Sequence, residues 1–314
     1  SSRRQRQMCI RDRLTFGEFN HYGSLAWAPD SQKIFFSAHR SENWELVSDE
    51  ADIYSVDIIT KDLIQISDEV GAERSPSISP NGKMIAYSFE ERRPLAYTPN
   101  QVAIMDINGN NKRIISKDLD GDADNLQWSD DNRSIFFSYD QRGIRKIGQL
   151  MLNGEIKNIT NGLGGTTLGR PYLSGSYHHS AQNIAFTYGG GNRPADVAVL
   201  MNGKVNVLTE LNNDLLDQLK LGDINELVYN SSFDDQEIQG WYITPPDFDP
   251  QKKYPLILEI HGGPHLAYGP YFSAELQIMA ASGYVVFYNN YRGSLSYGED
   301  FALLLQYKSV SYTH

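Results

Sequence analysis

The sequence predicts a mixed β and α/β chain, with four-stranded antiparallel units first and a parallel strand–helix–strand unit near the end. Three observations predict this. A pattern of about 50 residues occurs four times, Asn-Gly pairs stand where hairpins are needed, and an apolar run ends in two adjacent glycines before a helical pattern. The 19 Tyr, 26 Gly and 13 Pro residues also favour a chain rich in strands and turns.

The repeat is clearest in a four-residue strand core that recurs at intervals of 51, 50 and 49 residues. The cores lie at residues 34–37, 85–88, 135–138 and 184–187. A short strand and a turn precede each core, and two further strands follow it. Four strands per unit of about 50 residues are typical of β-propeller blades. We therefore expect part of a β-propeller, with about four four-stranded blades, over residues 14–210.

The other strands of each unit are expected at matching positions. Those before the cores lie at residues 25–30, 77–82, 126–131 and, in degenerate form, 172–175. Those after the cores lie at residues 53–57, 102–106, 147–150 and 197–200, and then at 63–67, 113–116, 156–160 and 205–209. Each fourth strand ends in Ser or Thr. The Asn-Gly pairs at residues 81–82, 108–109, 153–154 and 202–203 predict hairpins with type I′ turns.

The pattern changes at residues 211–222, which we expect to cross between two domains. Residues 227–233 and 238–244 indicate a hairpin. The apolar run at residues 256–260 is typical of a strand buried on both faces, and it ends at the loop 261–264. Helical spacing over residues 271–282 and a second apolar run at 285–288 then predict a parallel crossover.

The loop His261-Gly262-Gly263-Pro264 resembles the oxyanion loop of the α/β-hydrolases. With Asn290-Tyr-Arg-Gly-Ser294 and the residues up to Phe301, it resembles the prolyl oligopeptidase family of serine peptidases, most closely its acylaminoacyl-peptidase-like and dipeptidyl-peptidase-like branch. That family places a β-propeller before an α/β-hydrolase domain. The resemblance implies that residues 14–210 are a partial propeller and that residues 223–308 are the N-terminal part of the α/β-hydrolase domain.

The resemblance also implies roles for single residues. The Gly263 N–H would bind the carbonyl oxygen as it becomes an oxyanion, Gly262 would shape the loop, and His261 and Pro264 would fix it. The alternative is a strand-ending turn without a ligand. Arg292, beside Tyr291, would form either a structural ion pair or a contact with a substrate carbonyl. The implied substrates are short peptides, and no cofactor is implied.

No Gly-x-Ser-x-Gly nucleophile elbow occurs in the sequence. Ser296 has Gly298 two positions after it, but Ser294 two positions before it. In the family the elbow, the acid and the histidine lie further along, so we expect the Ser-His-Asp triad outside this chain and the chain itself to be inactive. Two other hypotheses stay open, namely a non-catalytic binding propeller fused to a degenerate hydrolase domain, and an esterase of the same architecture.

Composition excludes several function classes. The formal net charge of −11 argues against a nucleic-acid surface, and no apolar run is long enough to predict a membrane span. Cys9 is the only cysteine, which excludes disulfides within the chain. The oxygen-rich run at residues 118–125 lacks the glycine and glutamate spacing of a calcium loop, so no metal is expected.

Some properties stay open at this level. The oligomeric state, a homo-oligomer included, is not determined, and neither is the choice between cytoplasm and periplasm. Residues 1–13 and 309–314 are expected to be non-native tails, and the chain is expected to be a gene fragment truncated at both ends.

Overall fold

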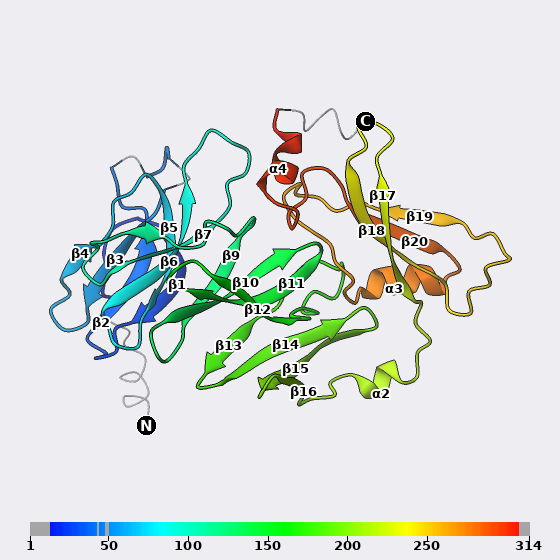
Figure 1. The fold of residues 1–314 in the computed structure, drawn as a ribbon, viewed down its shortest axis with the longest axis horizontal. Helices are drawn as coiled ribbons and strands as arrows, with labels where there is room; N and C mark the ends of the chain where they lie inside the picture. The colour runs from blue at the N-terminus through cyan, green and yellow to red at the C-terminus, as the bar shows by residue number, and fades with distance from the viewer. Residues whose placement is uncertain (1–12, 43, 48–49, 308–314) are drawn as a thin grey trace, which may run out of the picture. The chain divides into compact units, whose positions relative to one another are not determined.

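The computed structural model describes residues 13–42, 44–47 and 50–307 (Figure 1). Both expected tails, apart from Arg13, lie outside these described residues, and so does Cys9. Among the helices described, none has the length and apolar character that crossing a membrane requires. The chain divides into two compact units, residues 1–92 with 103–113, and residues 93–102 with 114–314.

The first unit is built on two four-stranded sheets in which neighbouring strands follow one another along the chain. The first sheet is β1 (His21–Trp27), β2 (Lys33–Ala38), β3 (Asp52–Asp57) and β4 (Leu63–Gln65). The second sheet is β5 (Gly71–Ile78), β6 (Met84–Glu91), β7 (Gln101–Asp106) and β8 (Arg113–Ile114). β1 runs antiparallel to β2, and β5 runs antiparallel to β6.

The second unit contains two more sheets of the same kind and a third of a different kind. The first two are β9 (Ala123–Trp128), β10 (Ser134–Gln141), β11 (Ile144–Met151) and β12 (Ile156–Asn161), then β13 (Tyr177–Ser180), β14 (Asn183–Gly190), β15 (Arg193–Met201) and β16 (Lys204–Val207). The third has the order β17-β18-β20-β19 and is formed by β17 (Ile224–Asn230), β18 (Glu237–Ile243), β19 (Leu256–Glu259) and β20 (Val285–Asn290). The helices are α2 (Asn213–Leu216), α3 (Ala274–Ala281), α4 (Glu299–Ala302) and the 3₁₀ turn η1 (Leu303–Leu305).

All four predicted strand cores are confirmed, as the second strands β2, β6, β10 and β14. The degenerate strand expected at residues 172–175 is wrong, because the first strand of that sheet is β13, further along. Tyr172 instead forms an isolated bridge with Tyr268, and their ring centroids lie 4.8 Å apart. That bridge pairs the Tyr172 backbone with the segment that follows the glycine loop, and Tyr177 begins the pairing with β14 instead.

The Ser or Thr at the end of the fourth strand has a structural role in three of the four repeats. The Ser67 hydroxyl accepts a hydrogen bond of 2.8 Å from Ile53 N, and Ser116 accepts one of 2.8 Å from Val102 N. Thr209 accepts one of 2.9 Å from Val197 N. In each case the hydroxyl satisfies an N–H of the third strand where the ladder to the fourth strand ends.

The Asn-Gly turns are of two types. Only Asn202-Gly203 has positive φ at both residues, at 50° and 73°, as type I′ requires. At the other three pairs glycine alone has positive φ, and its N–H bonds to the carbonyl three residues before, on Ser79, Asp106 or Met151. These three are therefore type I turns with glycine at the fourth position, and the type I′ expectation is wrong there.

The third sheet supplies the parallel crossover that the sequence predicted. β19 and β20 pair in parallel, and α3 connects them (Figure 1). Ser273 caps α3 by accepting from Leu276 N, and Leu276 and Ala280 face a core with Trp241, Val286 and Tyr288. The predicted burial of the first strand on both faces is wrong, because β19 is an edge strand. Leu256 and Leu258 are 64% and 54% exposed, since none of the described elements covers that face.

Candidate functional site

The paired-glycine loop follows β19 directly. His261 is buried with 2% of its surface exposed, while Gly262 and Gly263 are both exposed. Gly263 has a φ of 132°, a conformation that favours glycine, and Pro264 follows through a cis peptide bond. Within the described residues, neither the Gly262 N–H nor the Gly263 N–H donates a hydrogen bond. Because Gly263 is exposed and its N–H makes no hydrogen bond to the described residues, this N–H can bind a carbonyl oxygen or an anion.

Hydrogen bonds and ring contacts hold the His261 side chain in place. Its Nδ1 lies 2.9 Å from the Gly262 carbonyl oxygen, and its Nε2 lies 2.9 Å from Ser294 Oγ. The Tyr291 ring stacks on it with centroids 4.6 Å apart, and the Tyr268 ring meets it edge-on at 5.0 Å. Burial lowers the pKa of His261, against smaller opposing effects of the Gly262 carbonyl and the Asn290 amide. The imidazole is therefore neutral near pH 7.

A tight turn after β20 faces this loop. Ser294 N donates to the Tyr291 carbonyl at 3.0 Å, and Gly293 has a φ of 89° at the third position, as a type II turn requires. A Cβ on Gly293 would also lie 2.1 Å from Leu305 Cδ1, so both the turn and the packing need glycine there. The turn fixes Ser294, which is completely buried.

Three further hydrogen bonds join the loop to the turn. Tyr291 Oη donates to the His261 carbonyl at 2.8 Å, and His265 Nδ1 donates to the Gly293 carbonyl at 3.0 Å. Leu295 N donates to the Leu266 carbonyl at 3.0 Å. The two segments are thus braced at both ends of the glycine pair.

Asn290 has a structural role that sequence reasoning did not assign to it. Its Oδ1 accepts from Tyr268 N at 2.8 Å, and its Nδ2 donates to the Tyr268 carbonyl at 2.9 Å and to Tyr297 Oη at 2.8 Å. Tyr297 Oη in turn donates to Gln239 Oε1 at 2.6 Å. Its sequence signals were its position at the end of a strand, just before the turn, and its place in the motif Asn290-Tyr-Arg-Gly-Ser294.

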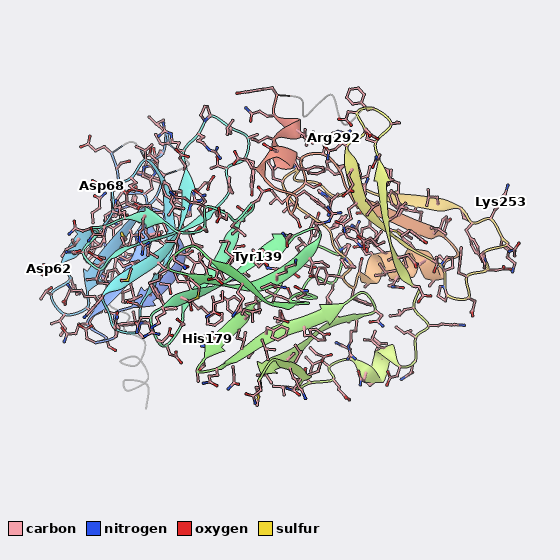
Figure 2. The ribbon with its side chains drawn as sticks, in the orientation of Figure 1. Asp62, Asp68, Tyr139, His179, Lys253 and Arg292 are labelled. Atoms are coloured by element: carbon pink, nitrogen blue, oxygen red, sulfur yellow. The ribbon has the colours of Figure 1, made fainter. Side chains whose placement is uncertain are left out.

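Arg292, one of the predicted site residues, is labelled in Figure 2. It forms an ion pair with Asp234 in the loop between β17 and β18. Only 14% of its side chain is exposed. Of the two expectations for Arg292, this contact corresponds to the structural ion pair.

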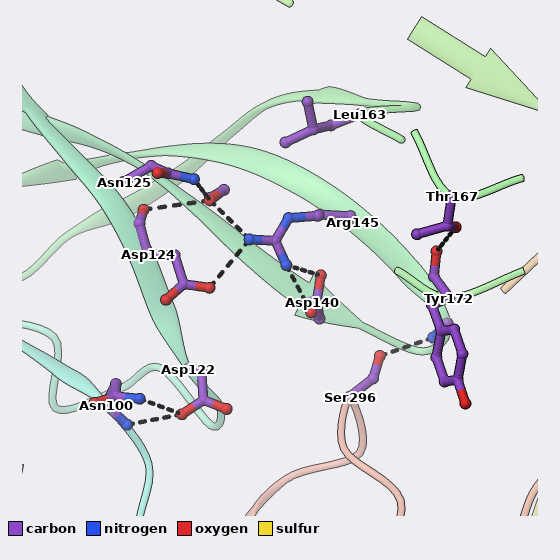
Figure 3. A network of polar contacts seen from close by, with 12 residues as sticks. Asn100, Asp122, Asp124, Asn125, Asp140, Arg145, Leu163, Thr167, Tyr172 and Ser296 are labelled. Atoms are coloured by element: carbon purple, nitrogen blue, oxygen red, sulfur yellow. Dashed lines mark hydrogen bonds and ion pairs between the residues drawn. The ribbon is translucent and has the colours of Figure 1, made fainter. Parts of the chain in front are cut away.

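Ser296 contacts the hairpin between β10 and β11. Its carbonyl accepts from Arg142 N at 2.7 Å, and its hydroxyl accepts from Gly143 N at 2.8 Å (Figure 3). Ser296 has a φ of 83°, which is strained for a residue with a side chain. These bonds give Ser296 a structural role inside the second unit.

Acidic side chains of residues 118–125 form ion pairs and hydrogen bonds with other residues. Asp124 and Asp140 both pair with Arg145 at 3.0 Å, and Asp122 accepts from Asn100 N at 2.8 Å (Figure 3). Asp120 accepts from Glu299 N at 3.0 Å. Burial raises the pKa of Asp140 to about 6, although Arg145 opposes this. No three His, Cys, Asp or Glu side chains within the described ranges are arranged to hold a metal ion.

A cavity of about 570 Å³ lies beside this run, lined by residues such as Tyr139, Arg142, Glu237, Tyr297 and Phe301. Its lining does not include the glycine pair.

Comparisons with known proteins agree on one family. Residues 270–313 match the model for the prolyl oligopeptidase family. Dipeptidyl-peptidase 5 of Porphyromonas gingivalis is 26% identical over 285 residues, which covers 88% of this chain and 40% of that protein. The chain thus spans about two fifths of the length of this curated relative.

Solved structures agree in fold. Pyrococcus horikoshii acylaminoacyl peptidase has a TM-score of 0.70 at 23% identity, over 89% of this chain and 41% of that chain. An acylaminoacyl peptidase in complex with a peptidyl chloromethyl ketone, Z-Gly-Gly-Phe-chloromethyl ketone, has a TM-score of 0.71 at 23% identity and the same coverage. At this identity, the similarity concerns the fold alone.

The chain therefore carries propeller-like four-stranded sheets and a further sheet whose parallel strand leads into the glycine loop. The family model and the curated relative agree with the resemblance to the prolyl oligopeptidase family that the sequence predicted, and the solved structures agree in fold.

Proposed function

We propose that the protein carrying this chain is a serine peptidase that cleaves short peptides by Ser-His-Asp acyl transfer. In this proposal residues 14–210 are propeller blades, residues 211–222 cross between the domains, and residues 223–308 begin an α/β-hydrolase domain. The nucleophile, acid and base come from sequence outside the chain, so the 314-residue chain alone is inactive.

The Gly263 N–H supplies one of the two donors to the oxyanion. The observation that carries this role is that the Gly263 N–H donates to none of the described residues. Hydrogen bonds of His261 with Ser294 and Tyr291 hold the loop in place. Such a donor is already in place before charge develops on the substrate oxygen, which is the condition for oxyanion stabilisation. The second donor is the N–H of the residue after the nucleophile.

The pair formed by Ser294 and His261 is not the catalytic pair in this proposal. Ser294 is 0% exposed and His261 is 2% exposed, so a peptide carbonyl cannot reach the Ser294 hydroxyl. Catalytic serines need access to substrate on a strained elbow, and Ser294 lies in a type II turn instead.

A fluorophosphonate probe tests the proposal on the complete gene product and on the 314-residue chain in parallel. We expect covalent labelling of the complete product and none of the chain. Failure of the folded complete product to label would overturn the proposal in favour of a binding propeller with a degenerate hydrolase domain. Hydrolysis of simple esters but not of dipeptidyl or acyl-aminoacyl amides would identify an esterase.

A matched pair of alanine substitutions tests the role of Gly263. Gly263→Ala places a side chain at a φ of 132°, so we expect the N–H to move and kcat of the complete product to fall about 100-fold. Gly262→Ala has open space around its Cβ and no positive φ, so its loss should be much smaller. Equal losses in the two variants would contradict the assignment of the donor to Gly263.

A further inference from the structure

The peptide group between Gly262 and Gly263 carries both the carbonyl that His261 contacts and the N–H that the proposed function requires. Only the bond from Gly263 to Pro264 is cis in this loop, so the preceding peptide is trans and its C=O and N–H point in opposite directions. His261 Nδ1 lies 2.9 Å from that carbonyl oxygen. A donor that holds the carbonyl therefore fixes the direction of the Gly263 N–H.

This contact depends on where the proton of His261 lies. A carbonyl oxygen only accepts hydrogen bonds, so Nδ1 must carry the hydrogen. In a neutral imidazole Nε2 is then an acceptor and needs a donor. Ser294 Oγ lies 2.9 Å from Nε2, and both residues are buried away from bulk water.

Other contacts fix the ring but not its proton. The stacked Tyr291 ring and the edge-on Tyr268 ring hold the imidazole plane, which opposes a flip that would exchange the two edges. The Asn290 side chain is a further hydrogen-bond partner of the ring, and its Nδ2 donates to the Tyr268 carbonyl and to Tyr297 Oη. The Gly262 carbonyl therefore requires the hydrogen on Nδ1, and the Ser294 hydroxyl is placed to donate to Nε2.

We propose that Ser294 is a positioning residue whose hydroxyl donates to Nε2 of His261 and holds the ring in place, so that Nδ1–H keeps the Gly262–Gly263 peptide with the Gly263 N–H directed outward. Ser294 does not touch the substrate and acts only through His261. The catalytic consequence rests on the proposed function, whereas the tautomer is a property of the folded chain.

The first experiment measures the tautomer directly in the 314-residue chain labelled with ¹⁵N. Two-bond proton–nitrogen correlations of the imidazole at pH 7.5 distinguish the protonated ring nitrogen from the unprotonated one. We expect His261 to carry its hydrogen on Nδ1 in the wild type, and Ser294→Ala to shift the Nε2 nitrogen resonance, because Nε2 loses its hydrogen-bond donor. A wild-type ring in the Nε2–H form, or an unchanged Nε2 resonance in S294A, overturns the proposal.

Ser273→Ala is the matched control. Ser273 is also completely buried, and its hydroxyl donates to the Gly169 carbonyl at 2.7 Å, but it contacts α3 instead of His261. We expect S273A to leave the His261 signals unchanged. Should S294A not fold, the wild-type spectrum still decides, because Nδ1–H supports the proposal and Nε2–H overturns it.

The second experiment measures kinetics in the complete gene product. Because the oxyanion exists only in the transition state, S294A should lower kcat about 10-fold and change KM less than about twofold, a fraction of the loss of a whole donor. An unchanged kcat in an active enzyme overturns the positioning role and leaves the proposed function intact. If the wild type hydrolyses none of the amide substrates, the proposed function fails, and the tautomer spectra alone decide this inference.

Discussion

Asn290, just before the turn at residues 291–294, is the residue on which the backbone after the glycine loop most depends. Its amide binds both backbone groups of Tyr268, and none of its surface is exposed. Asn290→Ala leaves a buried N–H and a buried C=O without their partner, so we expect the free energy of unfolding to fall by about 2–4 kcal/mol. Urea unfolding of the chain measures this change.

The neighbouring residue in β20 provides the control for that measurement. Asn289 lies on the other side of the strand, is half-buried, and makes one side-chain hydrogen bond, to Tyr229 Oη at 2.8 Å. Asn289→Ala should cost about 1 kcal/mol or less. A similar loss in both variants would show that the pairing with Tyr268 contributes no more stability than the single hydrogen bond of Asn289.

Residue roles were the part of the site that the sequence predicted least well. The motif at residues 290–294 was recognised, yet the partners of Asn290 and Arg292 lie 22 and 58 positions away along the chain. Long-range partners depend on how strands are ordered in the sheet, which a local pattern does not contain. The glycine pair was found because its signal is local, namely an apolar strand that stops at two glycines.

At the scale of elements, the Ser or Thr at the end of the fourth strand caps the third strand in three of the four repeats. Ser116→Ala removes the acceptor for Val102 N in a completely buried position, so we expect a loss of about 1–3 kcal/mol and faster amide exchange at Val102. Thr160 occupies the same repeat position, but its hydroxyl donates to the Asn161 carbonyl. Thr160→Val should therefore cost less than S116A, and the reverse order would contradict the capping role.

Ser296 combines a strained backbone conformation with a hydrogen bond to the hairpin between β10 and β11. Ser296→Ala loses the bond from Gly143 N and keeps the positive φ, whereas Ser296→Gly loses the same bond and relieves the strain. We expect S296A to lower the free energy of unfolding by about 1–3 kcal/mol, and S296G to be about 1 kcal/mol more stable than S296A. Urea unfolding compares the two, and a less stable S296G would refute the argument from φ.

Element types were predicted well, but their environment was not. The 50-residue repeat located all four second strands, because alternating apolar residues and turn residues act locally. The first strand before β14 was misplaced, since Tyr172 pairs with distant Tyr268. β19 was predicted as fully buried because its apolar run is continuous, but burial depends on where the strand lies in the sheet.

For the molecule as a whole, the net charge of −11 suggests that pH affects stability through carboxyl groups. Glu73 in the first unit is completely buried, and burial raises its pKa to about 7 although Lys112 Nζ lies 3.9 Å from Oε1. A raised carboxyl pKa means that the folded chain binds the proton more tightly than the unfolded chain. The stability from this group is therefore complete below about pH 4.5 and is lost as pH rises through about 7.

Glu73→Gln removes the dependence of stability on pH that comes from this buried carboxyl group. At pH 8 we expect E73Q to be about 1–3 kcal/mol more stable than the wild type, and at pH 5 the difference should shrink. Denaturant unfolding at both pH values measures it. Glu69→Gln is the control, because Glu69 lies 3.8 Å from the same Lys112 but is more exposed, and it should change little. A wild type that is more stable than E73Q at pH 8 would reverse the assignment.

The outer position of β19 also governs how concentrated solutions of the purified chain behave. Leu256 and Leu258 form an apolar stripe on a strand whose outer backbone groups have no neighbouring strand in the described sheet. Such an edge serves as a template on which further copies can stack, so the chain should form aggregates as concentration rises. A single lysine in place of Leu258 would put a charge on that stripe, and light scattering should then report monodisperse particles at concentrations where the wild type precipitates.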